Sequence, residues 1–474
     1  MQAVFIVMFR YGSGAMRRSI LAVVGIEKTA TTVAFLGCVA WSAFASFASP
    51  AAAEVLQVGP EKTFACIEDA VAAARPGDVI EVHALADEAP YETPAVLVRK
   101  PRLTIRGVPA EGRKYVPVSG KGFEYSGRGS TPRAIFQFDP GADDCTLVGF
   151  SLSGAHNSSH NGAGVRINQA NGVTIRDCEI HHNDMGIMSN GDGTIRRGRG
   201  QRIVQCHIHH NGDFEHPGYN HNLYLGGTSV ALLFCEVDHS LTGHNVKSRA
   251  HQMLVAYCYV HDSANREFDL VDAEDTTAPE SHAVLLGNII VKDPQCRGNR
   301  TTIHFGQDGG RNRDGTLYAA FNTIVTPFVS PVVDLSAPGA RAVLYGNFVT
   351  AAGRPAGNQQ AVHARAGAAL SGVQATMNWF DGRFRESFPA NLAENNLFTT
   401  LRQTPFSASE GPVFRLRPEL VADLPVRPRP DAVTLPTLIG LETECKWPAM
   451  AYRYLHPCGR ESVSRRAPVF GAVW

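Results

Sequence analysis

Lys247 is the side chain whose sequence surroundings best suit acid–base chemistry. It lies in the octet Gly-His-Asn-Val-Lys-Ser-Arg-Ala at 243–250, where Asn245, Lys247 and Arg249 alternate with less polar residues. A period of two is typical of a β-strand with one buried and one exposed face. We therefore expect Lys247 and Arg249 to leave the same face of a strand. There the crowding of two cations favours a lysine that releases its proton and acts as a base.

The strand of Lys247 recurs along the chain, so its residues belong to columns. Six short segments align beneath one another, starting at 164, 186, 222, 245, 267 and 302. Their second residues form an apolar column of Val165, Ile187, Leu223, Val246, Phe268 and Ile303. Their third residues form a mostly polar column of Arg166, Met188, Tyr224, Lys247, Asp269 and His304. We expect the first column to be core and the second to be surface.

A companion set of strands places cysteine at one inward position, and asparagine continues the column. The spacing runs from 23 residues (235 to 258) to 34 residues (288 to 322). The members are Cys178, Cys206, Cys235, Cys258, Asn288, Asn322 and Asn347. Because free cysteine behaves as a small apolar side chain, a buried ladder is the favoured interpretation, with disulfides or a metal site as alternatives.

A repeat of this length, with short β-runs, no helical periodicity between them and frequent Gly and Asn at the corners, predicts a solenoid of β-strands. We predict an all-β, right-handed parallel β-helix with an N-terminal capping helix and an irregular C-terminal cap or tail. The capping helix is expected at 65–74, with Ile67, Ala70 and Val71 on one side. The expected divisions are a signal peptide (1–53), an N-terminal strand and capping helix (54–100), the coils (101–351), and the last coils with the cap or tail (352–474).

Composition and the N-terminal sequence limit the partners. The 474 residues carry no net formal charge, which argues against a nucleic-acid partner, since that needs a basic surface. Basic residues up to Lys28, an apolar run to Ala48 and small residues at 51–53 are typical of an export signal, with an uncleaved membrane anchor as the alternative. No second apolar run of spanning length follows, so we expect no membrane partner after signal removal and a periplasmic or extracellular location. Cys445 and Cys458 are candidates for a disulfide.

Side chains at equivalent positions of neighbouring coils lie about 4.8 Å apart, the scale of one sugar ring. Elimination within a uronic acid needs a cation for the carboxylate, a base, and an acid for the leaving oxygen. The candidate catalytic residues are Lys247, Arg249, Tyr224, His244 and His221. The candidate substrate-binding residues are Asn222, Asn245, Glu267, Asp269, Arg266 and Arg166. The alternative is a solvated ladder in which Lys247 pairs with Asp269 or Glu267.

Two further features have two interpretations each. One pair of columns is rich in histidine and suits either a transition metal or, the favoured interpretation, a ladder of turn residues. These columns are His181, His209, Asp238 and His261, and beside them His182, His210 and His239. A run of arginines between 188 and 224 marks an inserted loop that either steers an acidic polymer or is simply solvated. Its members are Arg196, Arg197, Arg199 and Arg202.

The aligned coils, the segment Ala-Ala-Arg-Pro-Gly-Asp-Val-Ile at 73–80 and the octet at 243–250 resemble exported bacterial proteins of the pectate-lyase superfamily, over roughly 55–351. This resemblance implies the right-handed parallel β-helix. The Asn-Val-Lys-Ser strand is similar to the Lys-Ser strand of the chondroitinase B and alginate lyase family. That similarity implies that Lys247 removes the C5 proton of a uronic acid.

The same family resemblance implies calcium as a cofactor, whereas the sequence alone identifies no metal site. The family's calcium-binding glutamates correspond to Ser240 and Thr242 in this chain. Its catalytic arginine lies about one coil beyond the lysine, where this chain has Phe268 flanked by Arg266 and Asp269.

Three functions follow from these patterns. The leading hypothesis is an exported polysaccharide lyase that cleaves an acidic, uronate-containing polysaccharide by β-elimination. The second is a glycoside hydrolase that uses Glu267 and Asp269, which at two positions apart on a strand would be about 6–7 Å from each other. The third is a non-catalytic glycan-binding or export scaffold, because fold alone does not decide function.

Overall fold

The computed structural model describes residues 53–310, 312–351, 359–381, 383–384, 388–399, 405–408, 415–417, 420, 428–429 and 432–444. The expected signal peptide, apart from Ala53, and the candidate disulfide pair Cys445 and Cys458 lie outside these residues. Within them, no helix is long and apolar enough to cross a bilayer.

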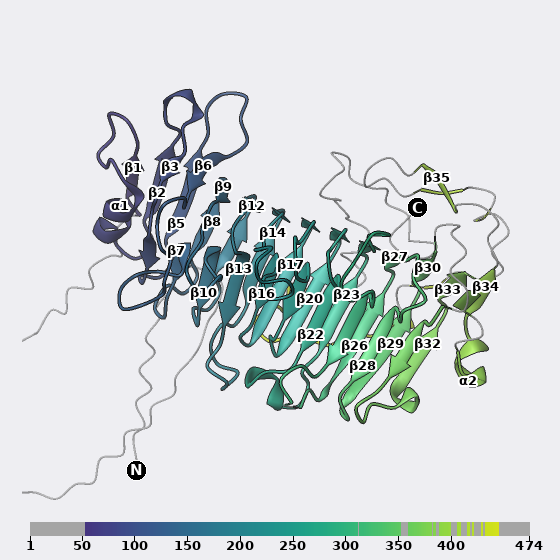
Figure 1. Cartoon of the computed structure of the whole chain (residues 1–474). Helices are drawn as coiled ribbons and strands as arrows, with labels where there is room; N and C mark the ends of the chain where they lie inside the picture. Colours follow the sequence, from purple (N-terminus) through teal and green to yellow (C-terminus); the bar gives the residue numbers. More distant parts are fainter. Residues whose placement is uncertain are drawn as a thin grey trace, which may run out of the picture. The chain divides into compact units, whose positions relative to one another are not determined.

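Three parallel sheets account for nearly all of the strands in the described part of the chain. The three sheets are named A, B and C. Each coil of the chain contributes one strand to sheet C, then one to sheet A and then one to sheet B. The chain then returns to sheet C one position further along. Figure 1 shows the strands of successive coils stacked in sequence order from β1 to β34. The predicted all-β parallel β-helix is confirmed.

The strands have the following bounds. Sheet A contains β1 (Val55–Val58), β2 (Val79–His83), β5 (Thr104–Val108), β8 (Thr146–Val148), β11 (Thr174–Arg176), β14 (Gln201–Val204), β17 (Ser229–Leu233), β20 (Gln252–Ala256), β23 (Ala283–Leu286), β26 (Gly315–Ala320), β29 (Ala340–Tyr345) and β32 (Val373–Thr376). Sheet B contains β3 (Tyr91–Glu92), β6 (Val116–Ser119), β9 (Phe150–Ser153), β12 (Glu179–His181), β15 (His207–His209), β18 (Glu236–Asp238), β21 (Tyr259–His261), β24 (Ile289–Val291), β27 (Thr323–Val325), β30 (Phe348–Thr350), β33 (Trp379–Asp381) and β34 (Leu397–Thr399). Sheet C contains β4 (Val96–Val98), β7 (Ala134–Phe138), β10 (Ala163–Asn168), β13 (Met185–Asn190), β16 (Leu223–Leu225), β19 (Val246–Ser248), β22 (Phe268–Val271), β25 (Ile303–Gly306), β28 (Val333–Ser336) and β31 (Val362–Ala364).

The remaining elements are short. They are the α-helices α1 (Ile67–Ala73) and α2 (Ala390–Ala393), the 3-10 helices η1 (Ala86–Glu88), η2 (Asp275–Thr277) and η3 (Leu370–Gly372), and an antiparallel pair of β35 (Phe406–Ala408) with β36 (Arg415–Leu416).

The register of sheet C follows the predicted columns. Val246 of β19 pairs with Leu223 before it and Phe268 after it, and these side chains are fully buried. Lys247 lies opposite Tyr224 and Asp269 on the other face. Shifting one strand by one residue would move its apolar set to the surface, so burial of the inward column fixes the register.

The corners between sheets A and B carry the predicted ladder. At this corner one residue takes a positive φ, as Asp177 does at 50°, and the next residue points inward. The amide N–H of Cys206 donates to Cys235 Sγ, and that of Cys258 donates to Asn288 Oδ1. The four cysteines of the column are buried and free, so the buried-ladder interpretation is confirmed. Thiol and amide oxygen thus accept the same corner hydrogen bond in different coils.

The first coil and the outer face of sheet A are covered by other segments. Helix α1 buries Ile67, Ala70 and Val71 against the first strands, as the sequence predicts. Leu438 and Leu441 of the C-terminal segment pack in one cluster with apolar side chains of sheet A. Each segment therefore covers apolar surface that a bare solenoid would expose.

We expect Asn322→Ala to destabilise the protein by about 3 kcal/mol, because several buried hydrogen-bonding groups lose their partner together. The Asn322 amide donates to Leu285 O and Asn347 Oδ1, and its Oδ1 accepts two bonds from Asn288. The measurement is the midpoint of thermal or urea unfolding. The exposed Gln374→Ala on β32 serves as the control and should leave the midpoint unchanged. Equal midpoints for both variants would show that the ladder does not hold the coils together.

Candidate active site

Lys247 lies on the outward face of sheet C and contacts two carboxylates. Its Nζ is 3.1 Å from Asp269 Oδ2 and 2.9 Å from Asp308 Oδ2. Arg249 Nη2 lies 2.7 Å from the same Oδ2 of Asp308. The predicted juxtaposition of Lys247 and Arg249 is thus present, and the two cations bracket one carboxylate.

Sequence reasoning missed Asp308, which lies in the turn after β25. Its amide N–H and that of Gly309 donate to Asp272 Oδ1, a fully buried carboxylate, at 2.6 and 2.8 Å. The Asp308 side chain is 40% exposed. The available signal was the glycine-rich turn at 306–310, which leaves a sheet C strand at the same end as Arg249. Because strands in a parallel sheet end at one edge, this turn and Arg249 meet there.

Asp269 is the buried centre of the cluster. Arg266 Nη1 and His304 Nδ1 lie 2.9 and 2.8 Å from its Oδ1, and His244 Nε2 lies 3.4 Å from its Oδ2. Burial alone would raise the pKa of Asp269. The hydrogen bond from His304 and the charges of Lys247 and Arg266 outweigh it and hold this pKa well below the ordinary value. Asp269 is therefore a fixed negative charge.

His304 extends this cluster to Ser336. Its Nε2 lies 2.6 Å from Ser336 Oγ, so an acid, an imidazole and a hydroxyl line up across β22, β25 and β28. The order resembles a nucleophilic triad. However, Ser336 is fully buried and its Oγ also accepts the amide N–H of Gln307. The chain of contacts therefore orients Asp269 and does not present a nucleophile.

His221 and His244 stack on each other beneath the column, with ring centroids 5.0 Å apart. The amide N–H of His244 donates to His221 Nδ1, and that of Arg266 donates to His244 Nδ1. Burial lowers the pKa of His244 to about 3, with Asp269 opposing the shift and Lys247 adding to it. Burial likewise puts the pKa of His221 well below its ordinary value, helped by the charges of His244 and Lys247. Both rings are neutral at pH 7.

Tyr224 precedes Lys247 by one coil and completes the outward column. Its ring lies 5.8 Å from the Arg249 guanidinium carbon and 5.5 Å from the His221 ring. The phenol is half-buried. Tyr224, Lys247 and Arg249 thus occupy one patch of the surface, as the sequence predicts.

The prediction that Asn222, Asn245 and Glu267 face outward is wrong. All three are fully buried at the corner before their strands. Asn222 Nδ2 donates to Asn245 Oδ1, Asn245 Nδ2 donates to Glu267 Oε2, and Lys292 Nζ lies 3.6 Å from Glu267 Oε1. The chain bends from sheet B to sheet C at this corner, so the alternation that holds within the strand does not extend back to it. These residues form a second internal ladder and cannot touch a polymer on the surface.

Arg166 lies three coils before Lys247 in the same column, at a separate polar cavity of about 180 Å³. Arg99, Gln137 and Asn168 also line this cavity. Burial, together with the charge of Arg133, lowers the pKa of Arg166. At about 4.8 Å per coil, the cavity lies roughly 14 Å from Lys247, within the reach of a bound oligosaccharide.

Two large exposed aromatic residues lie in the loop that leads into β16. Phe214 is 73% exposed and Tyr219 is 53% exposed. Aromatic rings with a free face offer apolar contact area to a ligand. Sequence reasoning missed both, because a loop residue's exposure is not encoded in a strand pattern.

The residues at the positions of the family's calcium ligands do not fit a calcium ion. Ser240 and Thr242 offer only hydroxyl groups and are 1% and 9% exposed, at the internal corner. Calcium in proteins prefers several carboxylate and carbonyl oxygens. No step of the chemistry below is derived through calcium.

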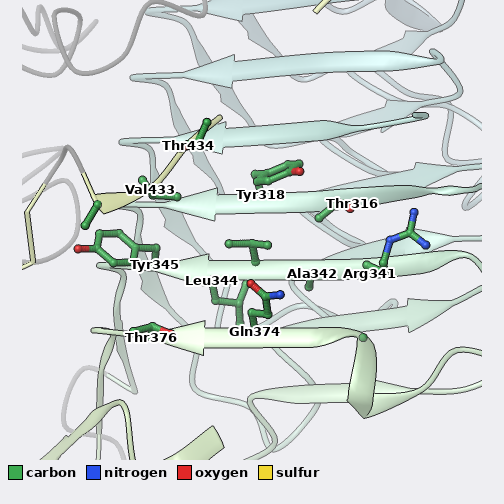
Figure 2. Close-up of a pocket in the computed structure, with 13 residues that line it drawn as sticks. Thr316, Tyr318, Arg341, Ala342, Leu344, Tyr345, Gln374, Thr376, Val433 and Thr434 are labelled. Atoms are coloured by element: carbon green, nitrogen blue, oxygen red, sulfur yellow. The ribbon is translucent and has the colours of Figure 1, made fainter. Parts of the chain in front are cut away.

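A larger cavity of about 440 Å³ lies on sheet A, away from Lys247. Figure 2 shows its lining side chains on neighbouring strands, with Val433 and Thr434 at one side. Arg341 is the one charged residue among those that line it. The cavity therefore lacks the lysine and carboxylates of the patch around Lys247. The predicted arginine loop does not include Arg202, which lies on strand β14. Its Nε is 2.6 Å from Glu444 Oε1, so Arg202 anchors the C-terminal segment.

Comparisons with known proteins find similarity to solved structures only. No family model and no curated protein matches the sequence. Among solved structures, a pectate lyase, Pel9A, aligns with 88% of this chain and 96% of its own at 12% identity and a TM-score of 0.47. An alginate lyase from Paenibacillus sp. str. FPU-7 aligns with 65% of this chain and 99% of its own at 16% identity and the same TM-score of 0.47. A pectin methylesterase from carrot aligns with 67% of this chain and 85% of its own, with 12% identity and a TM-score of 0.31.

We expect His244 to lower the free energy of unfolding as the pH falls through the range between its unfolded and folded pKa values. An unfolded histidine titrates near 6.5, whereas folded His244 has a pKa of about 3. Between these values the unfolded chain binds a proton that the folded chain does not, so the free energy of unfolding decreases as pH falls. From pH 6.5 to 4.5 this one group contributes about 2 kcal/mol of that decrease.

The test compares urea unfolding of wild type and His244→Gln at these two pH values. The variant keeps a hydrogen-bond acceptor but cannot titrate, so its loss of stability should be smaller by about 2 kcal/mol. The same loss in both proteins would mean that His244 is protonated without cost in the folded state.

Proposed function

We propose that this protein is a polysaccharide lyase that cleaves a uronate-containing polysaccharide by β-elimination. The supporting observation is that Lys247 and Arg249 bracket a single carboxylate, that of Asp308, at 2.9 and 2.7 Å beside Tyr224. A substrate carboxylate that replaced Asp308 would meet the Arg249 guanidinium and lie beside Lys247. Neutralising that carboxylate acidifies the adjacent C5 proton, which is the first requirement of the elimination.

In this proposal Arg249 binds the uronate carboxylate and Lys247 removes the C5 proton. The C5–H and C4–O bonds break, a C4–C5 double bond forms, and Tyr224 protonates the leaving oxygen. His221 and His244 hold the column from beneath as neutral rings. Lys247 must lose a proton before it can accept one, so the proposal also requires that substrate displaces Asp308 from it.

Binding of a longer chain would use the rest of sheet C. Arg166 and Arg99 at the polar cavity supply cations for a second carboxylate about three coils away. Phe214 and Tyr219 in the loop before β16 offer apolar faces to sugar rings. An acidic polysaccharide is therefore the proposed partner, and an exported location remains a prediction from the N-terminal sequence.

The glycoside hydrolase is the weaker candidate. Glu267 is internal, so the predicted pair of Glu267 and Asp269 does not face one substrate. The remaining pair, Asp269 and Asp308, contacts the same Lys247 ammonium. For both Asp269 and Asp308, hydrogen bonds and nearby cations outweigh burial and lower the pKa of the carboxyl group. A hydrolase needs one of its two carboxyl groups protonated, which two ionised groups do not supply.

Incubation of mature protein with a panel of uronate polymers should produce an unsaturated product that absorbs in the ultraviolet. Lys247→Ala should lose at least about 100-fold in rate, because the base is gone. Lys247→Arg should lose as much, because a guanidinium keeps the charge but does not release its proton. The exposed Lys62→Ala is the matched control and should match wild type.

The alternatives give distinct results in the same assay. Substantial activity in Lys247→Arg would make Lys247 a carboxylate-binding cation and move the base elsewhere. New reducing ends without the unsaturated product would indicate hydrolysis. Polymer binding without any turnover would indicate a scaffold protein.

Asp308→Asn should bind acidic polymer more tightly, with KM lowered by about two- to fivefold, because an internal competitor for Lys247 and Arg249 is removed. The measurement is KM at low and high salt, since a charge effect of this kind weakens with screening. Asp314→Asn, whose carboxylate pairs with Arg341 instead, is the control. A raised KM in Asp308→Asn would show that Asp308 supports substrate binding and does not compete with it.

A further inference from the structure

Sheet B carries a dense array of histidines and carboxylates on its outward face, apart from the patch around Lys247. Four consecutive strands, β12, β15, β18 and β21, and the turn residue after each contribute to it. The members are Glu179, His181, His182, His207, His209, His210, Glu236, Asp238, His239, His261 and Asp262. Seven of the 18 histidines in the sequence are therefore in one array.

The turn column of this array is explained by backbone conformation. His182, His210 and His239 have φ angles of 53°, 52° and 48°, and neighbouring rings stack within 8° of parallel. Histidine is one of the residues enriched in this left-handed region. The ladder interpretation from the sequence therefore suits this column.

The strand columns need a different explanation, because carboxylates and imidazoles converge there. Ligand atoms of His207, Glu236 and Asp238 all lie within 4.8 Å of one another. His207 Nε2 is 2.7 Å from Asp238 Oδ1, and His261 Nε2 is 3.4 Å from Glu236 Oε1. His207, Glu236 and Asp238, from β15 and β18, thus form one set of three ligand groups, and His261 of β21 adjoins this set through Glu236.

Neighbouring side chains hold His261 and Asp238 in place. His261 Nδ1 lies 2.7 Å from Asp262 Oδ2, and His239 Nδ1 lies 2.5 Å from Asp238 Oδ2. Metal-binding histidines and carboxylates usually have such outer partners, which fix the ring orientation. The His207 side chain is 35% exposed, so an ion can reach the set from solvent, whereas Asp238 is nearly buried.

The side-chain types also suit a divalent cation. The array contains four carboxylates and seven histidines. Imidazole and carboxylate together are a normal ligand set for a transition metal of the zinc type.

We propose that His207, Glu236 and Asp238 bind one divalent transition-metal ion of the zinc type, with His261 of the next coil beside Glu236. The ion would link two successive coils. In the chain β15, β18 and β21 are followed directly by β16, β19 and β22, which carry Tyr224, Lys247 and Asp269. The site is independent of the proposed lyase chemistry and holds the coils from which that chemistry is built.

The test is isothermal titration of tag-free, chelator-treated protein with zinc chloride, together with the visible spectrum of the cobalt-loaded protein. We expect wild type to bind zinc with a Kd of about 1 μM or tighter and to give a tetrahedral cobalt spectrum. Zinc should also raise the unfolding midpoint, because it binds only the folded coils.

His207→Ala and Glu236→Gln should each weaken zinc binding by at least about tenfold and remove the shift in midpoint. Glu236→Gln keeps the side-chain shape, so it tests the ligand even if His207→Ala folds poorly. His282→Ala, on a histidine outside the array, should bind zinc as wild type does. Equal zinc affinity in wild type and both ligand variants, or no binding by wild type at millimolar zinc, overturns the proposal.

Discussion

The in-register stacking of coils is the constraint on which the rest of this structure depends. Every side chain in a strand lies about 4.8 Å from its equivalents in the coils before and after, so each position in the repeat becomes a column through the molecule. An inward column must be apolar or must form its own hydrogen bonds, which is why cysteine and asparagine share one corner ladder from Cys178 to Asn378. An outward column is free to vary from coil to coil. Functional groups can therefore be assembled by changing single residues without altering the register.

Stacking also determines the electrostatics of the site. Like charges in neighbouring coils repel, so a column of several cations requires an acid between or beneath them. Asp269 fills that role: it lies next to Lys247 in the column and receives contacts from Arg266, His244 and His304. Its lowered pKa shows that the surrounding cations and the His304 hydrogen bond outweigh the cost of burial. Lys247 Nζ contacts both Asp269 and Asp308, so any role for Lys247 as a base depends on how substrate rearranges these contacts.

The sequence predicted the strand columns and the ladder between sheets A and B, but it failed at the corner between sheets B and C, for a physical reason. Within a strand the alternation of inward and outward side chains is imposed by the pleat, so the placement of Lys247 opposite Tyr224 and Asp269 followed from spacing alone. At the bend between sheets B and C this alternation stops, and Asn245 and Glu267 turn inward to form hydrogen bonds with the neighbouring coils. The contact of Asp308 with Lys247 depends on a turn held by Asp272, and no local pattern encodes a contact over that distance.

Two faces of the same coils carry different chemistry, and the geometry of the coil connects them. Residues 207–209, 236–238 and 259–261 precede the strands that carry Tyr224, Lys247 and Asp269 by one corner each. That corner is the internal ladder of Asn222, Asn245 and Glu267, whose amide and carboxylate groups are buried and bonded to one another. A displacement of one coil on sheet B would therefore strain this ladder and shift the column on sheet C. A packed interior transmits small shifts instead of absorbing them. Rigidity of the sheet B strands that carry the histidine array therefore contributes to the precision with which Lys247 and Arg249 bracket a carboxylate.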